Sequence, residues 1–338
     1  MIIIRVLIIS IFFFNALAAN SQESKESRVR SVLDKRGEVL LKLNRAEVSS
    51  EVMSDFSLDK IEGEDIYIYA GKKAYNSILE KKLNYDLVSS PGELANCKML
   101  KSIKGGSSSK SIWNYYPTYL QYDSLMQMFE DKYPHLCKKH IIGQLSSGRK
   151  IIAVNISDNI GVEEGEPRFF YTAAIHVNEL CTYVTQLRFI EYLLENYNND
   201  TYVKRLVDNI DIWINPLANP DGAYFSGDST VNGATRFNSQ GVDLNRNYPD
   251  IETAQNIDGF GLQEETKLFI AFADSMNFSM SANFHSGAEV VNFPWDKWQR
   301  DIADISWWRK VSKAYADTAM YSSGNNGYFD DFGVGYIK

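Results

Sequence analysis

Two of the four histidines follow apolar, strand-like runs, and strand ends are where open α/β sheets place binding residues. His176 directly follows the run RFFYTAAI, and Glu179 comes three residues later in the segment HVNE. In a turn from a strand into a helix, this spacing lets both side chains reach one ion. Zinc accepts imidazole nitrogen and carboxylate oxygen as ligands. His176 and Glu179 are therefore candidate zinc ligands.

A catalytic zinc site needs a third protein ligand and an open position for water. His285 lies near the end of another strand-like run, SMSANFHS, and is the candidate for that ligand. The HxxE pattern alone also arises by chance. The hypothesis of a metal site therefore depends on the second histidine at a strand end. His135 and His140 lie in EDKYPHLCKKHIIG, where the pattern favours solvated turn residues.

The segment TRFNSQGVDLNRNYPD adds polar residues of a second kind. Arg236 and Arg246 lie ten residues apart. A guanidinium matches a carboxylate with two hydrogen bonds and stabilises an oxyanion, so arginines near a metal suit a substrate with a free carboxylate. Asn245 precedes Arg246, and Asp243 could accept the second N–H of a zinc-bound histidine. Taken alone, each is better explained as part of an ordinary loop ion pair.

Composition limits the class of protein. The chain has 338 residues, of which 44% are hydrophobic, and a net charge of −8, which excludes collagen, coiled coil and wholesale disorder and suggests two domains. A pI near 5.2 disfavours nucleic acid as a partner, because phosphate binding needs concentrated Lys and Arg. Small molecules, peptides or proteins remain. Serine or cysteine hydrolysis is disfavoured, because there is no GxSxG and no cysteine has a motif-supported histidine partner.

Residues 1–18 carry one positive charge, an apolar run and small residues at positions 16 and 18, the pattern of a secretory signal peptide. A membrane anchor is the alternative, but the apolar run is short for a span of about 20 residues. We therefore expect a secreted or periplasmic protein with no stable membrane insertion after signal cleavage. Three cysteines without a CxxC pair are too few for a disulfide framework.

The remaining chain divides by pattern into two domains. Short strand-like and helical segments over residues 28–100 predict a small α+β unit, and the Gly/Ser-rich residues 101–111 predict a flexible linker. Over residues 112–338, apolar strand-like runs alternate with helical stretches, which predicts an α/β domain with a sheet covered on both faces. The predicted strands are KIIAVNIS, RFFYTAAI, DIWINPLA and SMSANFHS, and the predicted helices are 119–132, 184–197, 264–276 and 307–320.

Four segments, in this order, resemble the zinc metallocarboxypeptidase family of pancreatic carboxypeptidases: HVNE, NIDIWINPLANPDG, RFNSQGVDLNRNYPD and SANFHSGAEVVNFPWD. The resemblance covers residues from about 112 to 338, and four ordered motifs make it specific. It implies a mixed central sheet flanked by helices. It also implies that one zinc ion is held by His176, Glu179 and His285, and that the substrate is the C-terminus of a peptide or protein.

The resemblance assigns further roles. Asn245 and Arg246 would bind the terminal carboxylate of the substrate, Arg236 would polarise the scissile carbonyl, and Asp243 would orient a zinc-bound histidine. The segment NPDG resembles a family turn that we expect to be structural. The residues of the last motif, SANFHSGAEVVNFPWD, resemble the regulatory branch of the family and related bacterial enzymes more than the digestive branch.

The N-terminal unit resembles the activation domain that precedes the digestive enzymes, both in its position in the chain and in its alternating strand-like and helical segments. In that case Lys101, Lys104 and Lys110 in the linker are natural sites for proteolytic cleavage. A retained accessory domain is an equal alternative.

The sequence departs from the family pattern at its C-terminal end. The family's general base, a glutamate on a late strand, would fall after residue 338. Positioned proton transfer is worth roughly 10² to 10⁴ in rate, so we expect the sequence to lack the C-terminal part of the catalytic domain of a longer enzyme. The alternatives are a catalytically inactive zinc- and peptide-binding homologue, or a related zinc amidohydrolase that acts on cell-wall peptides.

Overall fold

The structure is a computed structural model of the chain. The predicted signal peptide, residues 1–18, and much of the predicted linker, residues 101–111, lie outside the described residues. In the part that is described, no helix is both long and apolar enough to cross a membrane. The chain divides into two compact units, Met1–Phe284 and His285–Lys338. The structure describes residues 25–49, 56–102, 109–250, 252–256, 258–287, 290–295, 300–323 and 331–332.

The N-terminal part of the first unit is a four-stranded antiparallel sheet in the order β2-β3-β1-β4. Alternate residues of β1 point to opposite faces, as the period of a strand requires. Leu41 and Leu43 pack with the helix over residues 25–36 and with α3, whereas Leu40 packs with Tyr69 and Phe237. The elements are β1 (Val39–Asn44), η1 (Arg45–Glu47), β2 (Ser57–Glu62), β3 (Asp65–Ala70), α3 (Lys72–Glu80), β4 (Asp86–Val88) and α4 (Pro91–Leu94).

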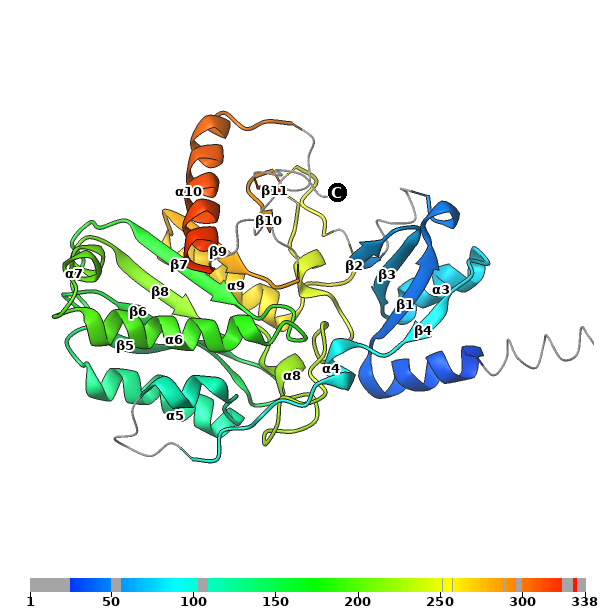
Figure 1. The fold of residues 1–338 in the computed structure, drawn as a ribbon, viewed down its shortest axis with the longest axis horizontal. Coiled ribbons are helices and arrows are strands. Elements are labelled where there is room, and N and C mark those ends of the chain that lie inside the picture. Colours follow the sequence, from blue (N-terminus) through cyan, green and yellow to red (C-terminus); the bar gives the residue numbers. More distant parts are fainter. Residues whose placement is uncertain are drawn as a thin grey trace, which may run out of the picture. The chain divides into compact units, whose positions relative to one another are not determined.

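The larger sheet of the first unit has five strands in the order β5-β6-β8-β7-β9 (Figure 1). β5 pairs with β6 and β6 with β8 in antiparallel fashion, whereas β7 runs parallel to both β8 and β9. The sheet is therefore mixed, as predicted. The strands are β5 (Cys137–Gln144), β6 (Lys150–Ile156), β7 (Arg168–Ala173), β8 (Asp211–Asn215) and β9 (Met280–Phe284).

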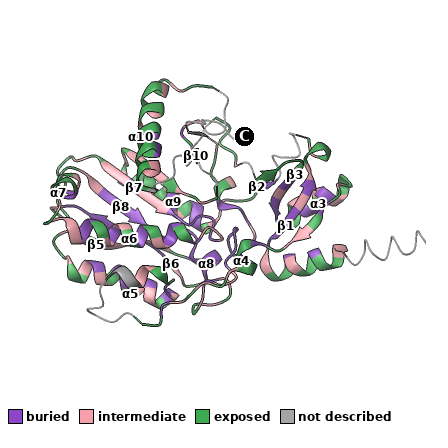
Figure 2. Cartoon of the chain, in the orientation of Figure 1, coloured by how far each residue is buried: buried purple, intermediate pink, exposed green. Residues whose placement is uncertain are grey.

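Helices cover both faces of this sheet. Side chains of α5, α6 and α7 join the core on one face, and Phe269 of α9 joins the core on the other. Most of β6 is buried, whereas α6 alternates buried and exposed positions along its length (Figure 2). The helices are η2 (Ser109–Asn114), α5 (Tyr119–Lys132), α6 (Cys181–Asn196), α7 (Thr201–Val207), α8 (Pro220–Ala223), η3 (Leu244–Arg246) and α9 (Glu264–Met276).

Local chemistry explains where these helices begin and end. α5 begins at Tyr119 because Thr118 and Gln121 form a capping box, in which each side chain accepts the backbone N–H of the other residue. α9 ends at Met276 because Asn277 adopts a left-handed backbone with φ 52°. Both helices match their predicted ranges.

The second unit contains α10 (Ile305–Ser323) and a two-residue parallel pair, β10 (Val290–Val291) with β11 (Asp331–Phe332). The helix covers the predicted range 307–320 and extends it at both ends.

In the two larger sheets β2 and β5 were not predicted, and neither was the short pair of β10 and β11. One interpretation was also wrong. β2 and β5 carry many polar residues, so neither shows the apolar pattern of the other strands. His140 lies within β5 and is partly buried, with its ring centroid 4.5 Å from that of Trp213, rather than in a solvated turn. Burial lowers the pKa of His140. His135 is exposed, as expected.

Candidate metal centre

The HVNE segment is a tight turn between β7 and α6. β7 ends at Ala173, and Ala174 takes a left-handed backbone with φ 55°, a conformation that costs a non-glycine residue about 1 kcal/mol. The chain then turns through His176 and Glu179 before α6 begins at Cys181. His176 is 1% exposed. The strained residue therefore directs the histidine inward at the end of the strand.

Each ring nitrogen of His176 lies beside a carboxylate oxygen. Nε2 lies 2.9 Å from Asp243 Oδ1, so it carries the hydrogen and donates it, because an ionised carboxylate only accepts. Nδ1 then presents its lone pair 3.1 Å from Glu179 Oε1. Two zinc ligands in a tetrahedral site lie roughly 3 to 3.5 Å apart. The donor types and their separation therefore fit a zinc ion that His176 and Glu179 would hold.

Asp243 fixes His176 from a buried position. The residue is 6% exposed and caps the short helix η3, where its Oδ1 also accepts the backbone N–H of Asn245 at 2.9 Å. Burial raises the pKa of Asp243, but the interaction and hydrogen bond with His176, with Arg236 and Arg246 nearby, outweigh it and hold the pKa well below its usual range. Asp243 is therefore ionised, and its contact with Nε2 fits the predicted role of orienting the imidazole, which stays a prediction.

Arg236 lies beside the same pair. Its Nη1 donates to Glu179 Oε1 at 3.0 Å, and its Nε lies 4.0 Å from Asp243 Oδ2. The residue is 7% exposed, because Nε also donates to Ser57 Oγ at 2.8 Å and the guanidinium lies 5.4 Å from the ring centre of Tyr69. Both Ser57 and Tyr69 belong to the N-terminal sheet. Arg236 is thus next to the candidate metal ligands but covered.

One buried asparagine joins the three loops of the site. Asn219 donates from Nδ2 to Ile175 O and to Phe237 O, each at 3.2 Å, and its Oδ1 accepts the N–H of Gly222 at 2.8 Å. A Cβ on Gly222 would come within 2.8 Å of Phe237 O. The NPDG turn is therefore structural, as expected, because it holds the HVNE turn against the loop that carries Arg236.

The two residues expected to bind a terminal carboxylate lie on η3. Asn245 is exposed and Arg246 is half-buried, and the guanidinium of Arg246 donates to the carbonyl of Asn245 at 3.1 Å. Asp243, two residues before Asn245, contacts Nε2 of His176. The structure thus brings six of the seven predicted site residues together within the first unit, namely His176, Glu179, Arg236, Asp243, Asn245 and Arg246.

His285 is the first residue of the second unit and directly follows β9. Its neighbour Phe284 pairs with Ala173, three residues before His176. The chain therefore enters both histidine segments from adjacent strand ends. The third-ligand role of His285 stays a prediction.

The residue just before β1 contributes a carboxylate that no sequence motif marks. Glu38 is 1% exposed, and its two oxygens accept the backbone N–H groups of Arg236 at 3.0 Å and of Phe237 at 2.7 Å. Burial raises the pKa of Glu38 to about 7, although these hydrogen bonds and the charges of Arg36 and Arg236 act in the opposite direction. Glu38 precedes an ordinary apolar strand, so no motif marked it.

Residues 122–336 match the zinc carboxypeptidase family, Peptidase_M14. The chain belongs to this family. The match confirms the predicted family, whose members are zinc-dependent hydrolases, and the family implies zinc for the donor set described above.

Named relatives agree with this assignment. Human carboxypeptidase D is 38% identical over 184 residues, which are 54% of this chain and 13% of that protein. The catalytic chain of human carboxypeptidase N is 31% identical over 202 residues, which cover 52% of this chain and 44% of that one. The chain thus spans less than half of each curated relative.

Solved structures confirm the fold. Thrombin-activatable fibrinolysis inhibitor superposes with a TM-score of 0.63 at 16% identity over 88% of this chain and 84% of that chain. Carboxypeptidase A from Helicoverpa armigera gives 0.59 at 18% identity over 84% of this chain and 78% of that chain. Each superposition covers a larger fraction of this chain than residues 112–338 alone would provide. The structural similarity therefore extends into the N-terminal part of the chain.

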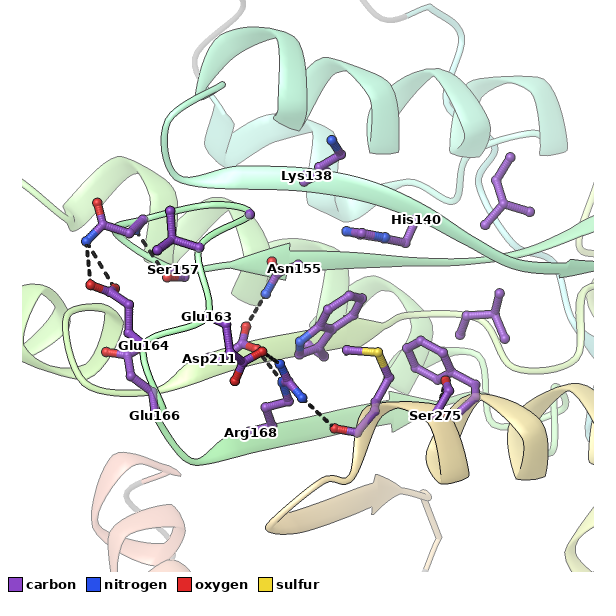
Figure 3. Close-up of a pocket in the computed structure, with 18 of the residues that line it drawn as sticks. Lys138, His140, Asn155, Ser157, Glu163, Glu164, Glu166, Arg168, Asp211 and Ser275 are labelled. Atoms are coloured by element: carbon purple, nitrogen blue, oxygen red, sulfur yellow. Dashed lines mark hydrogen bonds and ion pairs between the residues drawn. The ribbon is translucent and has the colours of Figure 1, made fainter.

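A separate cavity of about 600 Å³ lies between β5, β6, β8 and α9 and contains none of the predicted site residues (Figure 3). Some of its polar groups are paired with one another. Arg168 binds Asp211 and Glu163, and Glu164 accepts from Asn159 at 3.0 Å. The candidate zinc ligands His176 and Glu179 lie outside this cavity, in the turn between β7 and α6.

Replacing Asp243 with Asn should weaken zinc binding by about 10- to 100-fold, because the neutral amide holds the His176 tautomer less firmly and removes a charge beside the metal. Competition with a chromogenic chelator measures the affinity. Asp131→Asn, on an exposed position of α5, is the control and should bind zinc as the unaltered protein does. Equal zinc affinity in the Asp243 variant would contradict the assignment.

Glu38 should make the folded protein sensitive to pH. Its raised pKa means that the folded state keeps a proton that the unfolded state has lost, so this contribution to stability is complete below about pH 4.5 and disappears as pH rises through about 7. Relative to Glu38→Gln, the free energy of unfolding of the unaltered protein should fall by about 3 kcal/mol across this range. Urea titrations at several pH values measure it, and parallel pH profiles for the two proteins would refute the argument.

Proposed function

We propose that this protein is a zinc-dependent carboxypeptidase that removes the C-terminal residue of peptides or proteins. One observation carries the proposal: a single atom, Asp243 Oδ1, accepts both His176 Nε2–H and the backbone N–H of Asn245. The candidate metal ligand and the candidate carboxylate-binding segment are therefore held at a fixed separation. An enzyme that cleaves next to a free C-terminus needs that fixed separation.

Each residue has a role in this proposal. His176, Glu179 and, by family resemblance, His285 would hold one zinc ion, which when bound lowers the pKa of water and polarises a carbonyl. Arg236 donates hydrogen bonds to the oxyanion that forms when the scissile carbonyl is attacked. Asn245 and Arg246 bind the terminal carboxylate, for which a guanidinium fork is suited.

Two other functions remain as alternatives. An inactive homologue would keep zinc and bind free C-termini without cleaving them, because the family's glutamate base would be missing. A zinc amidohydrolase would cleave cell-wall peptides in preference to ordinary C-terminal residues. A panel of free peptides, C-terminally amidated peptides and cell-wall peptides, assayed for both binding and hydrolysis, separates all three.

Replacing Arg246 with Ala should lower the affinity and kcat/KM for peptides with a free C-terminus by about 10- to 100-fold, because a charge-assisted hydrogen bond is lost. Peptides with an amidated C-terminus should be unaffected. Arg205→Ala, on an exposed arginine of α7, is the control and should leave both unchanged. If the Arg246 variant still prefers peptides with a free C-terminus over amidated peptides as before, Arg246 does not bind the terminal carboxylate.

We also propose that the N-terminal unit, residues 28–100, acts as an inhibitory pro-domain. Ser57 and Tyr69 of this unit cover the Arg236 guanidinium, and Asn178 of the HVNE turn donates to Tyr69 OH at 3.0 Å. A covered arginine cannot reach a substrate carbonyl. A retained accessory domain is the alternative, in which substrate would approach without displacing these contacts.

Cleavage within residues 101–111 should raise peptidase activity at least about tenfold, because it frees the N-terminal unit to leave Arg236. Limited digestion with trypsin, followed by mass spectrometry and an activity assay, tests this. A mature form that begins before Arg28 and has full activity would favour the accessory domain instead.

We propose a secreted or periplasmic location, which rests on the signal-peptide pattern of residues 1–18. N-terminal sequencing of the protein purified from its source tests this. A mature chain that begins shortly after residue 18 supports export.

A further inference from the structure

The carboxylate of Glu38 contacts the loop that carries Arg236 in the way that a bound anion contacts its binding site. Each carboxylate oxygen of Glu38 accepts one backbone N–H, from two consecutive residues, Arg236 and Phe237. Consecutive backbone N–H groups that converge on one anion are a recurrent way in which proteins bind anions. The carboxylate and both donors are buried.

The donors and the acceptor come from different parts of the fold. Glu38 precedes β1 of the N-terminal sheet, 198 residues before Arg236 in the chain. The neighbouring loop residues have their own partners, because Thr235 N–H donates to Gly222 O and Asn238 N–H to Val242 O. Only the N–H groups of Arg236 and Phe237 in this run are directed at Glu38. A buried N–H without an acceptor is costly, so this pair needs an acceptor whenever Glu38 is absent.

The surrounding backbone is shaped to admit the carboxylate. Gly37, immediately before Glu38, has φ +75°, and a Cβ there would lie 3.1 Å from the Cα of Gly241. Gly241 has φ +71°, and its Cβ would lie 2.8 Å from Gly37 O. Both positions therefore require glycine for conformation and for space. The close approach carries Glu38 to the two N–H groups.

Burial opposes an anion at this position, and two nearby positive charges partly offset that cost. Arg36 and Arg236 both favour the ionised form of Glu38. The guanidinium of Arg236 is directed elsewhere, to Ser57 and Glu179, so the backbone of this residue binds Glu38 while its side chain faces the candidate metal ligands. A carboxylate bound to these N–H groups therefore lies beside the reactive site, on a different segment from Asn245 and Arg246.

We propose that the backbone N–H groups of Arg236 and Phe237 form a carboxylate-binding subsite, distinct from the Asn245–Arg246 clamp, which Glu38 fills from the N-terminal unit and which accepts another carboxylate in its place. The subsite itself does not depend on hydrolysis. That the second carboxylate belongs to an acidic side chain of the peptide substrate rests on the proposed function.

The test is chemical rescue in the full chain. Glu38→Ala leaves the two N–H groups without their carboxylate, and sodium acetate at pH 8 should raise the Tm of this variant by about 2 to 4 °C more than sodium chloride at the same ionic strength. The amide proton signals of Arg236 and Phe237 should move downfield as acetate is added. The unaltered protein and Glu38→Gln, in which a side chain of full length fills the space, should respond equally to acetate and chloride.

Equal effects of acetate and chloride on Glu38→Ala would overturn the subsite. If that variant does not fold in chloride, the yield of refolding becomes the measurement: recovery in acetate alone supports the subsite, and failure in both salts rejects it.

The substrate role has its own measurement. After cleavage within residues 101–111, the ratio of kcat/KM for peptides with Glu and with Gln before the C-terminal residue should be larger in sodium chloride than in sodium acetate at the same ionic strength, because the departed N-terminal unit no longer supplies Glu38 and acetate competes for the two N–H groups. Equal ratios would reject acidic side chains as ligands. Absence of any hydrolysis would count against the proposed function. The acetate experiment would still test the subsite, because it does not depend on hydrolysis.

Discussion

The parallel pairing of β7 with both β8 and β9 is the constraint on which the candidate site depends. Parallel neighbours place their carboxyl ends at one edge of a sheet, and loops at that edge form binding crevices in open α/β folds. Here the HVNE turn follows β7, the NPDG turn follows β8, and His285 follows β9. Asn219 then ties the first two loops to the loop that carries Arg236.

The site on this edge is a small buried network of ionisable groups. His176, Asp243 and Arg236 are each less than 10% exposed, and each contacts another member of the group or Glu179. Buried charges are tolerated only when they are paired and hydrogen-bonded. The network is therefore rigid before any ligand binds, and the donor pair of His176 and Glu179 is held ready for a metal. This pre-organisation is what the zinc carboxypeptidase family assignment leads one to expect.

The N-terminal sheet meets this network at Arg236 from two sides. Ser57 and Tyr69 engage the guanidinium, and Glu38 engages the backbone of the same residue. In contrast, Asn245 remains exposed on η3. The N-terminal sheet thus covers the residue proposed to stabilise charge at the scissile bond and leaves open the segment proposed to bind the terminal carboxylate. Inhibition by such a unit would act on the chemistry more than on the first recognition of a C-terminus.

The sequence by itself determined the family, the mixed α/β fold and the segments of the site, because apolar periodicity and the four ordered motifs are local properties of the chain. The ranges of α5 and α9 followed from capping and periodicity in the same way. Tertiary structure alone decided the rest. The polar strands β2 and β5 take their conformation from pairing with neighbours. Glu38 acquires its role only because two glycines let its strand approach a loop 198 residues away, and no pattern within a single segment records a contact over that distance.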